Sequence, residues 1–310
     1  MKYKEWLSEW LENYVGPTSK AKTYSRYSQI IRCHLSPRLG NYEMEELTPQ
    51  LLQQQIVDMS KSGNQRTGKG LAPSTLNLIV AVIQGSLETA FSIGLCQTYA
   101  ADKIKRPRIE EKKVQIFTVH EQKVLEEAIK NDKRVKTVGI LLCLYTGLRI
   151  GELLALEWSD IDFDKKEISI SKTCHDDVDE RGNYVRFVNL PKTTTSMRVI
   201  PIPRQLVPLL RETKKKNGSK YVVGQGDKVI SVRSYQRTYE LILKKHGLPH
   251  RGFHALRHTF ATRALECGMD VKTLSEILGH KNSTVTLNRY AHSLMEHKKD
   301  MMNRLGKLFN

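Results

Sequence analysis

An ordered set of side chains in this sequence could carry out phosphoryl transfer without a metal ion. Guanidinium groups donate paired hydrogen bonds to non-bridging phosphate oxygens and so stabilise the negative charge of a phosphorane-like transition state. A histidine can move a proton near neutral pH, a lysine can protonate a departing alkoxide, and a tyrosine in positive surroundings can act as nucleophile. The chain offers all of these groups, in the order Arg149, Lys192, His254, Arg257, His280 and Tyr290.

The stretch HALRH, residues 254–258, raises the alternative of a zinc site, because two histidines four residues apart on a helix can bind zinc. A metalloprotease motif has a glutamate directly after the first histidine, whereas this chain has Ala255 there, and the guanidinium of Arg257 would repel a divalent cation. We therefore expect no metal ion here and assign His258 to structural support. For any one of these residues alone, a surface or capping role is the simpler interpretation; the ordered set favours chemistry.

Helix ends in the second half of the chain are expected to position these groups. Apolar residues recur at helical spacing over 118–130 and 134–146. Gly147 ends the second pattern and Ile150 restarts it, which places Arg149 at a corner between two helices.

Beyond this corner the apolar period changes to two, which is typical of β-strands. Three short strands are predicted, at 167–173, 184–190 and 198–203. The first connection is interpreted as a charged loop and the second as a tight hairpin tip that carries Lys192. From residue 233 the pattern is helical again, so the chain is expected to be mainly α with a small antiparallel three-stranded sheet.

The first hundred residues are predicted to form a separate, all-helical unit. Helical patterns occur at 2–14, 20–34, 48–61 and 73–94. The loop GNQRTGKG joins flexible glycines to Arg66 and Lys69. This loop is either a solvated turn or, in so basic a chain, a phosphate contact.

The charge balance favours a polyanionic partner. The chain has 50 Lys and Arg against 33 Asp and Glu, a net charge of +17, which suits nucleic acid or an anionic membrane surface. No stretch approaches the roughly eighteen consecutive apolar residues of a membrane span, so the membrane alternative is weak. Residues 100–115 carry six basic residues and a proline without apolar periodicity. They are interpreted as an extended interdomain linker in which Lys105 and Arg106 contact DNA.

The five cysteines are widely scattered and include no C-x-x-C pair that would indicate zinc or a redox motif. We interpret them as reduced, mostly buried thiols of an intracellular protein.

The motifs resemble those of the tyrosine recombinase, or phage integrase, family. The resemblance runs from Thr118 to the C-terminus and rests on TGLRIGEL, PKTTTSMR, HALRHTFAT, ILGH and NRYAH. The first hundred residues, with HLSPRLG followed by MEELTP, are similar to the helical core-binding domain of integrases of bacteriophages and conjugative transposons. The resemblance implies a C-shaped, two-domain clamp: a core-binding domain over 1–99, a linker over 100–115, an α+β catalytic domain over 116–290 and a tail over 291–310.

The resemblance implies site-specific DNA recombination, the integration and excision of a mobile element. Tyr290 would attack a phosphodiester, leaving a 3'-phosphotyrosine and a free 5'-hydroxyl. Lys192 would be the general acid, and His254 would accept the proton of the tyrosine or position it. Because one ester is exchanged for a similar one, and because no Walker-type loop or carboxylate cluster occurs in the sequence, no ATP, Mg²⁺ or other cofactor is expected.

The remaining site residues would bind the scissile phosphate. The resemblance assigns this to Arg149 and Arg257, with His280 bonding a non-bridging oxygen. Glu152 matches an acidic position of the family that supports Arg149, although from the sequence an ordinary exposed helical glutamate is an equal alternative.

The implied partners are double-stranded DNA with inverted core sites and three further copies of the chain, giving a tetramer on two DNA sites in the bacterial cytoplasm, associated with the nucleoid. Accessory DNA-bending or excision factors would assist, and no membrane is involved. The tail would dock on its own domain or on a neighbouring protomer. A type IB topoisomerase and a noncatalytic DNA-binding protein stay open as alternatives, as does the presence of the arm-binding domain that many integrases carry at the N-terminus.

Overall fold

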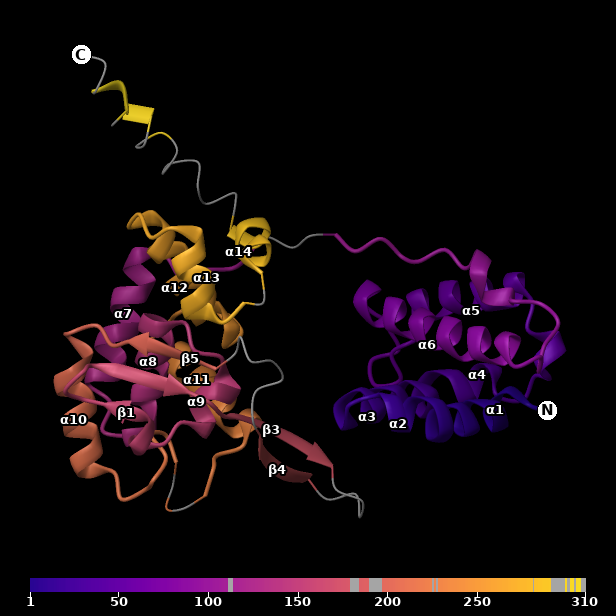
Figure 1. The fold of residues 1–310 in the computed structure, drawn as a ribbon, viewed down its shortest axis with the longest axis horizontal. Helices are drawn as coiled ribbons and strands as arrows, with labels where there is room; N and C mark the ends of the chain where they lie inside the picture. The colour runs from indigo at the N-terminus through magenta and orange to yellow at the C-terminus, as the bar shows by residue number, and fades with distance from the viewer. Residues whose placement is uncertain are drawn as a thin grey trace. The chain divides into compact units, whose positions relative to one another are not determined.

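The computed structural model divides the chain into two units, Met1–Lys112 and Lys113–Asn310, each with its own hydrophobic core (Figure 1). The structure describes residues 1–110, 114–178, 184–189, 197–224, 226, 228–280, 282–290, 299, 302–303 and 305–307. Lys192 and most of the tail over 291–310 lie outside the described residues, as does the side chain of Tyr290. What the sequence predicts for those groups therefore stays a prediction.

Helices form the first unit, in the four places that the sequence predicts. They are α1 Tyr3–Trp10, α2 Gly16–Thr18, α3 Ala21–Ile30, α4 Ser36–Leu39, α5 Pro49–Ser62 and α6 Pro73–Ser92. The first two predicted helices run further than expected, because five-residue π turns at Leu11–Val15 and Ile31–Leu35 continue α1 into α2 and α3 into α4. Proline at the first turn of α5 and of α6 begins each helix where a missing N–H has no cost.

The last of these helices, α6, is the centre of the first core. Its apolar face is at most 2% exposed at Leu76, Ile79, Val80, Ile83 and Leu87. The first helix is fixed to it by two polar contacts: Trp6 Nε1 donates to the backbone oxygen of Ser86 at 2.9 Å, and the hydroxyl of Tyr3 lies 2.8 Å from Ser86 Oγ. Buried indole and phenol groups thus have their hydrogen bonds satisfied, as a stable core requires.

Residues 100–107 differ from the predicted extended linker, because they pack on the first unit. Ala100–Lys103 forms a 3-10 turn, and the spacing of three residues buries both Ala101 and Ile104. The backbone N–H of Lys105 donates to Gln53 Oε1 at 2.9 Å. Two apolar residues were too few to give a visible period in so basic a segment.

The second unit mixes helices and strands. Its elements are α7 Val119–Lys130, α8 Val138–Thr146, α9 Ile150–Ala155, β1 Ile161–Asp162, β2 Glu167–Ile170, β3 Thr173–Val178, β4 Tyr184–Asn189, β5 Arg198–Pro201, α10 Leu206–Lys216, α11 Val232–Lys245, α12 His254–Glu266, α13 Val271–Leu278 and α14 Ser283–Tyr290. The helical patterns predicted before residue 147 are confirmed, as are those between residue 233 and Tyr290, and α10 is an addition to them.

The strands form two antiparallel sheets where one was predicted. β1, β2 and β5 make the three-stranded sheet in that order, with Ile168 opposite Ile200, while β3 and β4 pair as a separate ribbon (Figure 1). The sheet has the predicted size and direction, but the predicted strand over 184–190 does not belong to it. The charged loop predicted over 174–183 was wrong for residues 174–178, which belong to β3, while residues 179–183 lie outside the described residues. The strands on either side of Lys192 pair with other strands, so the hairpin predicted between them was wrong too. An alternating pattern identifies a strand without identifying the strand that pairs with it.

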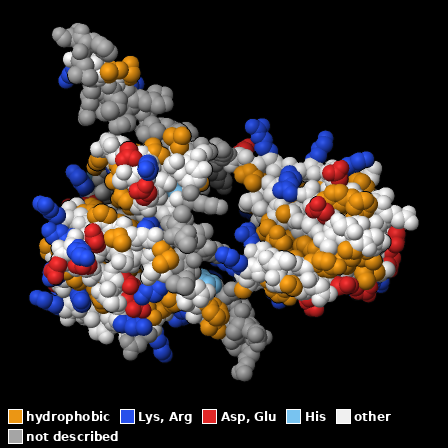
Figure 2. All heavy atoms as spheres, viewed as in Figure 1, with side chains coloured by type: hydrophobic (Ala, Val, Ile, Leu, Met, Phe, Trp, Pro, Cys, Tyr) orange, Lys and Arg blue, Asp and Glu red, His pale blue; other side chains and the backbone are white. Residues whose placement is uncertain are grey.

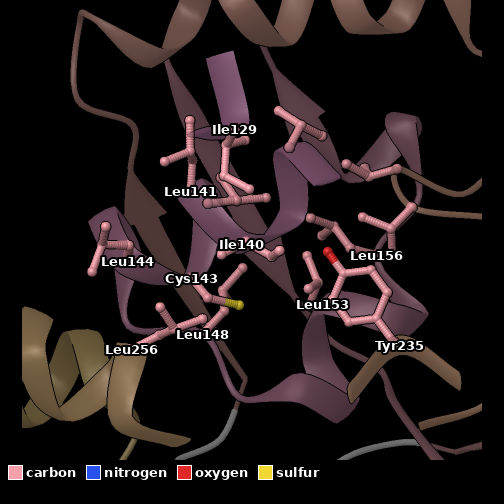
Figure 3. Close-up of a cluster of buried hydrophobic side chains, with 14 of the residues drawn as sticks. Ile129, Ile140, Leu141, Cys143, Leu144, Leu148, Leu153, Leu156, Tyr235 and Leu256 are labelled. Carbon is pink, nitrogen blue, oxygen red and sulfur yellow. The ribbon is translucent and has the colours of Figure 1, made fainter. Parts of the chain in front are cut away.

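The buried helix α8 is the centre of the second core. Residues 138–144 and Thr146 of this helix are all buried, as expected of a helix that is apolar on every side. Figure 3 shows Leu153, Leu156, Tyr235 and Leu256 around it. Neighbouring elements therefore pack around this one helix. Its C-terminal end leads into the corner at Arg149.

Acidic and basic side chains are interspersed on the face of the second unit that Figure 2 draws. Among the described helices, none is long and apolar enough to cross a membrane. All five cysteines are free. The prediction that they are mostly buried was wrong, because only Cys143 and Cys174 are buried and Cys267 is exposed.

Candidate active site

Two helices that end in left-handed glycines form the base of the site. Gly147 follows α8 with a φ of 68°, and Gly279 follows α13 with a φ of 63°, a conformation that glycine adopts without strain. A Cβ atom on Gly147 would also lie 2.6 Å from Cδ1 of Phe260 and 2.7 Å from Cδ2 of Leu278. The close approach brings the carbonyl groups at both helix ends, which lack partners within their own helices, toward α12.

Arg257 lies between these two ends and is only 2% exposed. Its Nη1 donates to the backbone oxygen of Gly147 at 2.7 Å, and its Nη2 donates to the backbone oxygen of Leu278 at 2.7 Å. Its Nη2 also lies 2.9 Å from Nε2 of His280. A buried guanidinium is tolerated only when its donors are satisfied, and the carbonyl groups at a helix C-terminus satisfy them and carry a negative partial charge.

Arg149 is the N-cap residue of α9, the corner that the sequence predicts. Its backbone N–H and its Nη1 donate to the two carboxylate oxygens of Glu152 at 2.9 and 2.8 Å. Its Nη2 donates to the backbone oxygen of Gly279 at 3.0 Å. The side chain is 35% exposed, so it is held in place while still accessible to a ligand. Glu152 is buried and paired, and the alternative of an ordinary exposed helical residue was wrong.

Arg198, at the start of β5, is a member of the site that the sequence analysis missed. Its Nη1 and Nη2 donate to both oxygens of Glu152 at 3.0 and 2.9 Å, and its Nε donates to the backbone oxygen of Ile277 at 2.6 Å. It lies two residues before buried Ile200, on the core-facing side of an alternating strand. In the sequence, an arginine at a core-facing position of a predicted strand was the signal that could have indicated a buried ion pair.

Glu152 stays ionised because of its two arginines. Burial opposes the charged form, but the hydrogen bonds and attraction of Arg198, and then of Arg149, outweigh it and lower the pKa of Glu152 from its usual 4.5 to about 2. The stabilisation that these pairs give is therefore fully present above pH 4.5 and is lost as the pH falls toward 2.

Three guanidinium groups thus bind three successive carbonyl oxygens at the C-terminal end of α13. Arg198 binds that of Ile277, Arg257 that of Leu278 and Arg149 that of Gly279. Among the described residues, the carboxylate of Glu152 forms ion pairs with two of these cations, Arg149 and Arg198. The surplus of positive charge and the accessible Arg149 make this corner a binding site for an anion with several oxygen acceptors.

The histidines lie around the same corner. His280 contacts Arg257 through Nε2, and its Nδ1 lies 2.6 Å from the hydroxyl of Thr286 on α14. His254 is exposed at the first residue of α12, and its ring packs edge-on against that of His258 at 4.5 Å between centroids. No three His, Cys, Asp or Glu side chains in the described part of the chain are placed to hold a metal ion.

The structure therefore brings together four of the predicted site residues, Arg149, Glu152, Arg257 and His280, and places His254 and His258 on the helix of Arg257. The backbone of Tyr290 ends α14, the helix that contacts His280 through Thr286. Lys192 lies outside the described residues.

The four predicted DNA contacts all belong to the first unit and are exposed. The loop of Arg66 and Lys69 is a closed turn, because the N–H groups of Asn64 and Gly68 donate to the backbone oxygens of Lys69 and Asn64 at 2.8 Å. The closed turn fixes the backbone positions from which Arg66 and Lys69 extend. Arg106 donates to Gln84 Oε1, and Lys105 is held through its backbone.

We expect Arg198→Met to lower the free energy of unfolding by about 3 kcal/mol at pH 7, because it removes one partner from a buried ion pair. Glu152→Met combined with Arg198→Met should cost less than the two single changes added together. Arg211→Met, which removes an exposed ion pair with Asp164, is the matched control and should cost less than about 1 kcal/mol. Urea unfolding followed by circular dichroism measures the free energy of unfolding of Arg198→Met, Glu152→Met, their combination and Arg211→Met. Equal losses for Arg198→Met and Arg211→Met would contradict the prediction.

Comparison with known proteins gives consistent matches over nearly the whole chain. Residues 115–297 match the phage integrase family, and residues 2–60 match the phage integrase N-terminal SAM-like domain. A tyrosine recombinase XerC-like protein of Caldanaerobacter subterraneus is 33% identical over 98% of this chain and 82% of its own length. The ICEBs1 integrase of Bacillus subtilis is 26% identical over 94% and 79%. Among solved structures, the Tn1549 transposon integrase in complex with transposon right end DNA covers 99% of this chain and 100% of its own, with a TM-score of 0.81 at 23% identity.

Proposed function

Because this chain belongs to the phage integrase family, we propose that it recombines DNA at specific sites for a mobile element, through a 3'-phosphotyrosine intermediate. It is a tyrosine recombinase of the integrase type. The observation that carries the proposal is the end of α13, where Arg149, Arg257 and His280 converge beside the helix that ends at Tyr290. A scissile phosphodiester carries one negative charge and two non-bridging oxygens, which suits this surplus of cationic donors.

We assign phosphate binding to the two arginines of that corner. Arg149 is accessible and fixed by Glu152, so it meets a phosphate oxygen with little loss of side-chain freedom. Arg257 donates from Nη2 to His280, and a phosphate oxygen beside the ring would take over this bond. Both guanidiniums then stabilise the charge that develops on the phosphorus oxygens as the nucleophile attacks.

Proton transfer is assigned to residues around the phosphate. Tyr290 attacks the phosphorus through its phenolic oxygen, and His254, exposed at the start of α12, accepts or guides the phenolic proton. Lys192 protonates the departing 5'-oxygen. The tyrosine ester replaces a DNA ester of similar energy, so the 5'-hydroxyl of another strand can reverse the step without ATP or a metal ion.

DNA is the proposed polyanionic partner of the whole chain, which carries a net charge of +17. Residues 1–99 are proposed to bind the core site, with Arg66 and Lys69 on phosphates. Lys105 and Arg106 of the 100–115 segment are proposed to contact further phosphates, and residues 116–290 to catalyse. Since affinity from phosphate contacts falls steeply with salt, binding should weaken by about 10³-fold or more between 50 and 200 mM salt.

Exchange of both strands between two duplexes requires four cleavages. We therefore propose a tetramer with one tyrosine per cleavage, in which the tail over 291–310 links protomers. The bacterial relatives include an integrase and a transposon transposase by name. We therefore place the reaction on bacterial DNA in the cytoplasm, assisted by accessory DNA-bending or excision factors.

Trapping of a covalent adduct tests the proposal. Duplexes drawn from the DNA on both sides of the gene are nicked next to each candidate cleavage position, so that the short 5'-hydroxyl fragment diffuses away and religation stops. We expect a protein–DNA adduct that survives denaturing electrophoresis and disappears on proteolysis. Binding of such duplexes without any adduct would support a noncatalytic DNA-binding protein. Relaxation of a supercoiled plasmid by monomers, without exchange between duplexes, would support a type IB topoisomerase.

A further inference from the structure

Thr286 is the buried residue among positions 283–287, the part of α14 whose side chains the structure describes. Its side chain is fully buried, whereas Ser283, Thr284, Val285 and Leu287 of the same helix are exposed. The side chains from Asn288 onwards lie outside the described residues. Thr286 stands four residues, about one helical turn, before Tyr290. Within the described part of α14, the contact with the rest of the site thus centres on one hydroxyl group.

The hydroxyl of Thr286 and the guanidinium of Arg257 contact opposite nitrogens of the His280 ring. Thr286 Oγ1 lies 2.6 Å from Nδ1, and Arg257 Nη2 lies 2.9 Å from Nε2. A guanidinium has no acceptor, so Nε2 accepts in this state. A neutral ring then carries its proton on Nδ1 and donates it to Thr286. The chain of contacts runs from α12 through the ring to α14.

We propose that Thr286 is a positioning residue that sets the protonation state of His280 and couples it to the seating of the nucleophile helix. This inference rests on the proposed function and deepens it. To donate a hydrogen bond to a non-bridging oxygen, His280 must carry a proton on Nε2. The ring is then either neutral, with no proton on Nδ1, or cationic, with a proton on both nitrogens. A threonine hydroxyl suits every state, because it accepts from Nδ1–H and donates to a bare Nδ1.

The state of the His280 ring is coupled to the position of the nucleophile because Thr286 and Tyr290 lie on the same helix, α14. A displacement of α14 withdraws the hydroxyl from Nδ1, and the ring loses the contact that orients it on the side opposite Arg257. The phosphate site is therefore complete only when the helix of Tyr290 is seated. Cleavage is in this way restricted to subunits whose nucleophile helix is docked.

Single-turnover cleavage of the nicked duplex, with protein in excess over DNA and saturating, tests the role of the hydroxyl. Thr286→Val keeps the volume and branching of the side chain and removes the hydrogen bond. We expect the cleavage rate constant to fall about tenfold or more, the loss of one hydrogen bond at a reacting site, with DNA affinity unchanged. Thr286→Ser restores the hydroxyl and should remain within about threefold of the wild type. Thr284→Val, the same change on an exposed residue of the same helix, is the matched control and should have little effect.

A double-variant cycle with His280→Ala distinguishes action through the ring from a merely structural role. In the His280→Ala background, Thr286→Val should cause no further loss of rate. If Thr286→Val does not fold, as judged by thermal unfolding, Thr286→Ala provides the hydroxyl-free partner of Thr286→Ser. Equal rates for wild type and Thr286→Val, or a full additional loss in the His280→Ala background, would overturn this inference alone. A wild-type protein that binds DNA without forming any adduct would overturn the proposed function and the inference with it.

Discussion

Replacement of Tyr290 by phenylalanine is expected to abolish the covalent adduct and to leave DNA affinity unchanged. The variant lacks only the phenolic oxygen that would form the phosphotyrosine bond, and loss of a nucleophile typically lowers the rate by about 10³-fold or more. The phosphate-binding arginines and the exposed cations of the first unit are untouched, so binding to duplex DNA should persist with the same salt dependence.

The measurement is the yield of adduct on the nicked duplex, alongside a binding titration with the intact one. Tyr42→Phe is a matched control, because it makes the same change on an exposed tyrosine of the first unit. Full adduct formation by the Tyr290 variant would show that another residue is the nucleophile and would sink the assignment. Loss of adduct in both variants would point instead to a general defect.

Replacement of Arg257 by lysine should be nearly as severe, despite the unchanged charge. The guanidinium binds the backbone oxygens of Gly147 and Leu278 and the ring of His280 at once, through two nitrogens that point in fixed directions. A single ammonium group cannot reach all three, and it leaves buried carbonyl groups without donors. We expect the single-turnover cleavage rate to fall by about 10²-fold or more and the free energy of unfolding to fall by about 3 kcal/mol.

Arg263→Lys is the matched control, because Arg263 lies on the same helix α12, is 25% exposed, pairs with Glu266 and donates to one backbone oxygen, that of Phe117. This change should cost less than about 1 kcal/mol and leave cleavage nearly unaffected. Rate measurements at a temperature where both variants are folded separate catalysis from stability. A normal cleavage rate in the Arg257 variant would remove this arginine from the phosphate site.

Local features of the site could be predicted from the sequence. The break at Gly147 places Arg149 at a corner because glycine adopts the left-handed conformation that ends a helix, and that preference is written in one residue. Helical spacing likewise predicted α12, and with it Arg257 and the two histidines. Each of these inferences depends on neighbours within a few positions along the chain.

Contacts between distant segments could not be predicted in the same way. Arg198 and Glu152 are far apart in sequence, and their pairing depends on β5 lying beside α9 and α13 in three dimensions. The separation of β3 and β4 from the main sheet also depends on which strand finds which partner, and an alternating pattern specifies a face without specifying a neighbour. The bond between Thr286 and His280 gave no signal, because one threonine in a helix is unremarkable by type.

The arginines at the end of α13 are held by backbone oxygens, and every amino acid supplies that atom. A substitution at Ile277 therefore leaves the backbone oxygen that accepts from Arg198 in place. The position of this positive charge does not depend on which side chain stands at residue 277. The requirement falls instead on the path of the chain, which turns at Gly279 with a positive φ, where an added Cβ would lie 3.0 Å from Nη1 of Arg198. The bond to Arg198 thus places no demand on the side chain at position 277, whereas the turn two residues later admits little besides glycine.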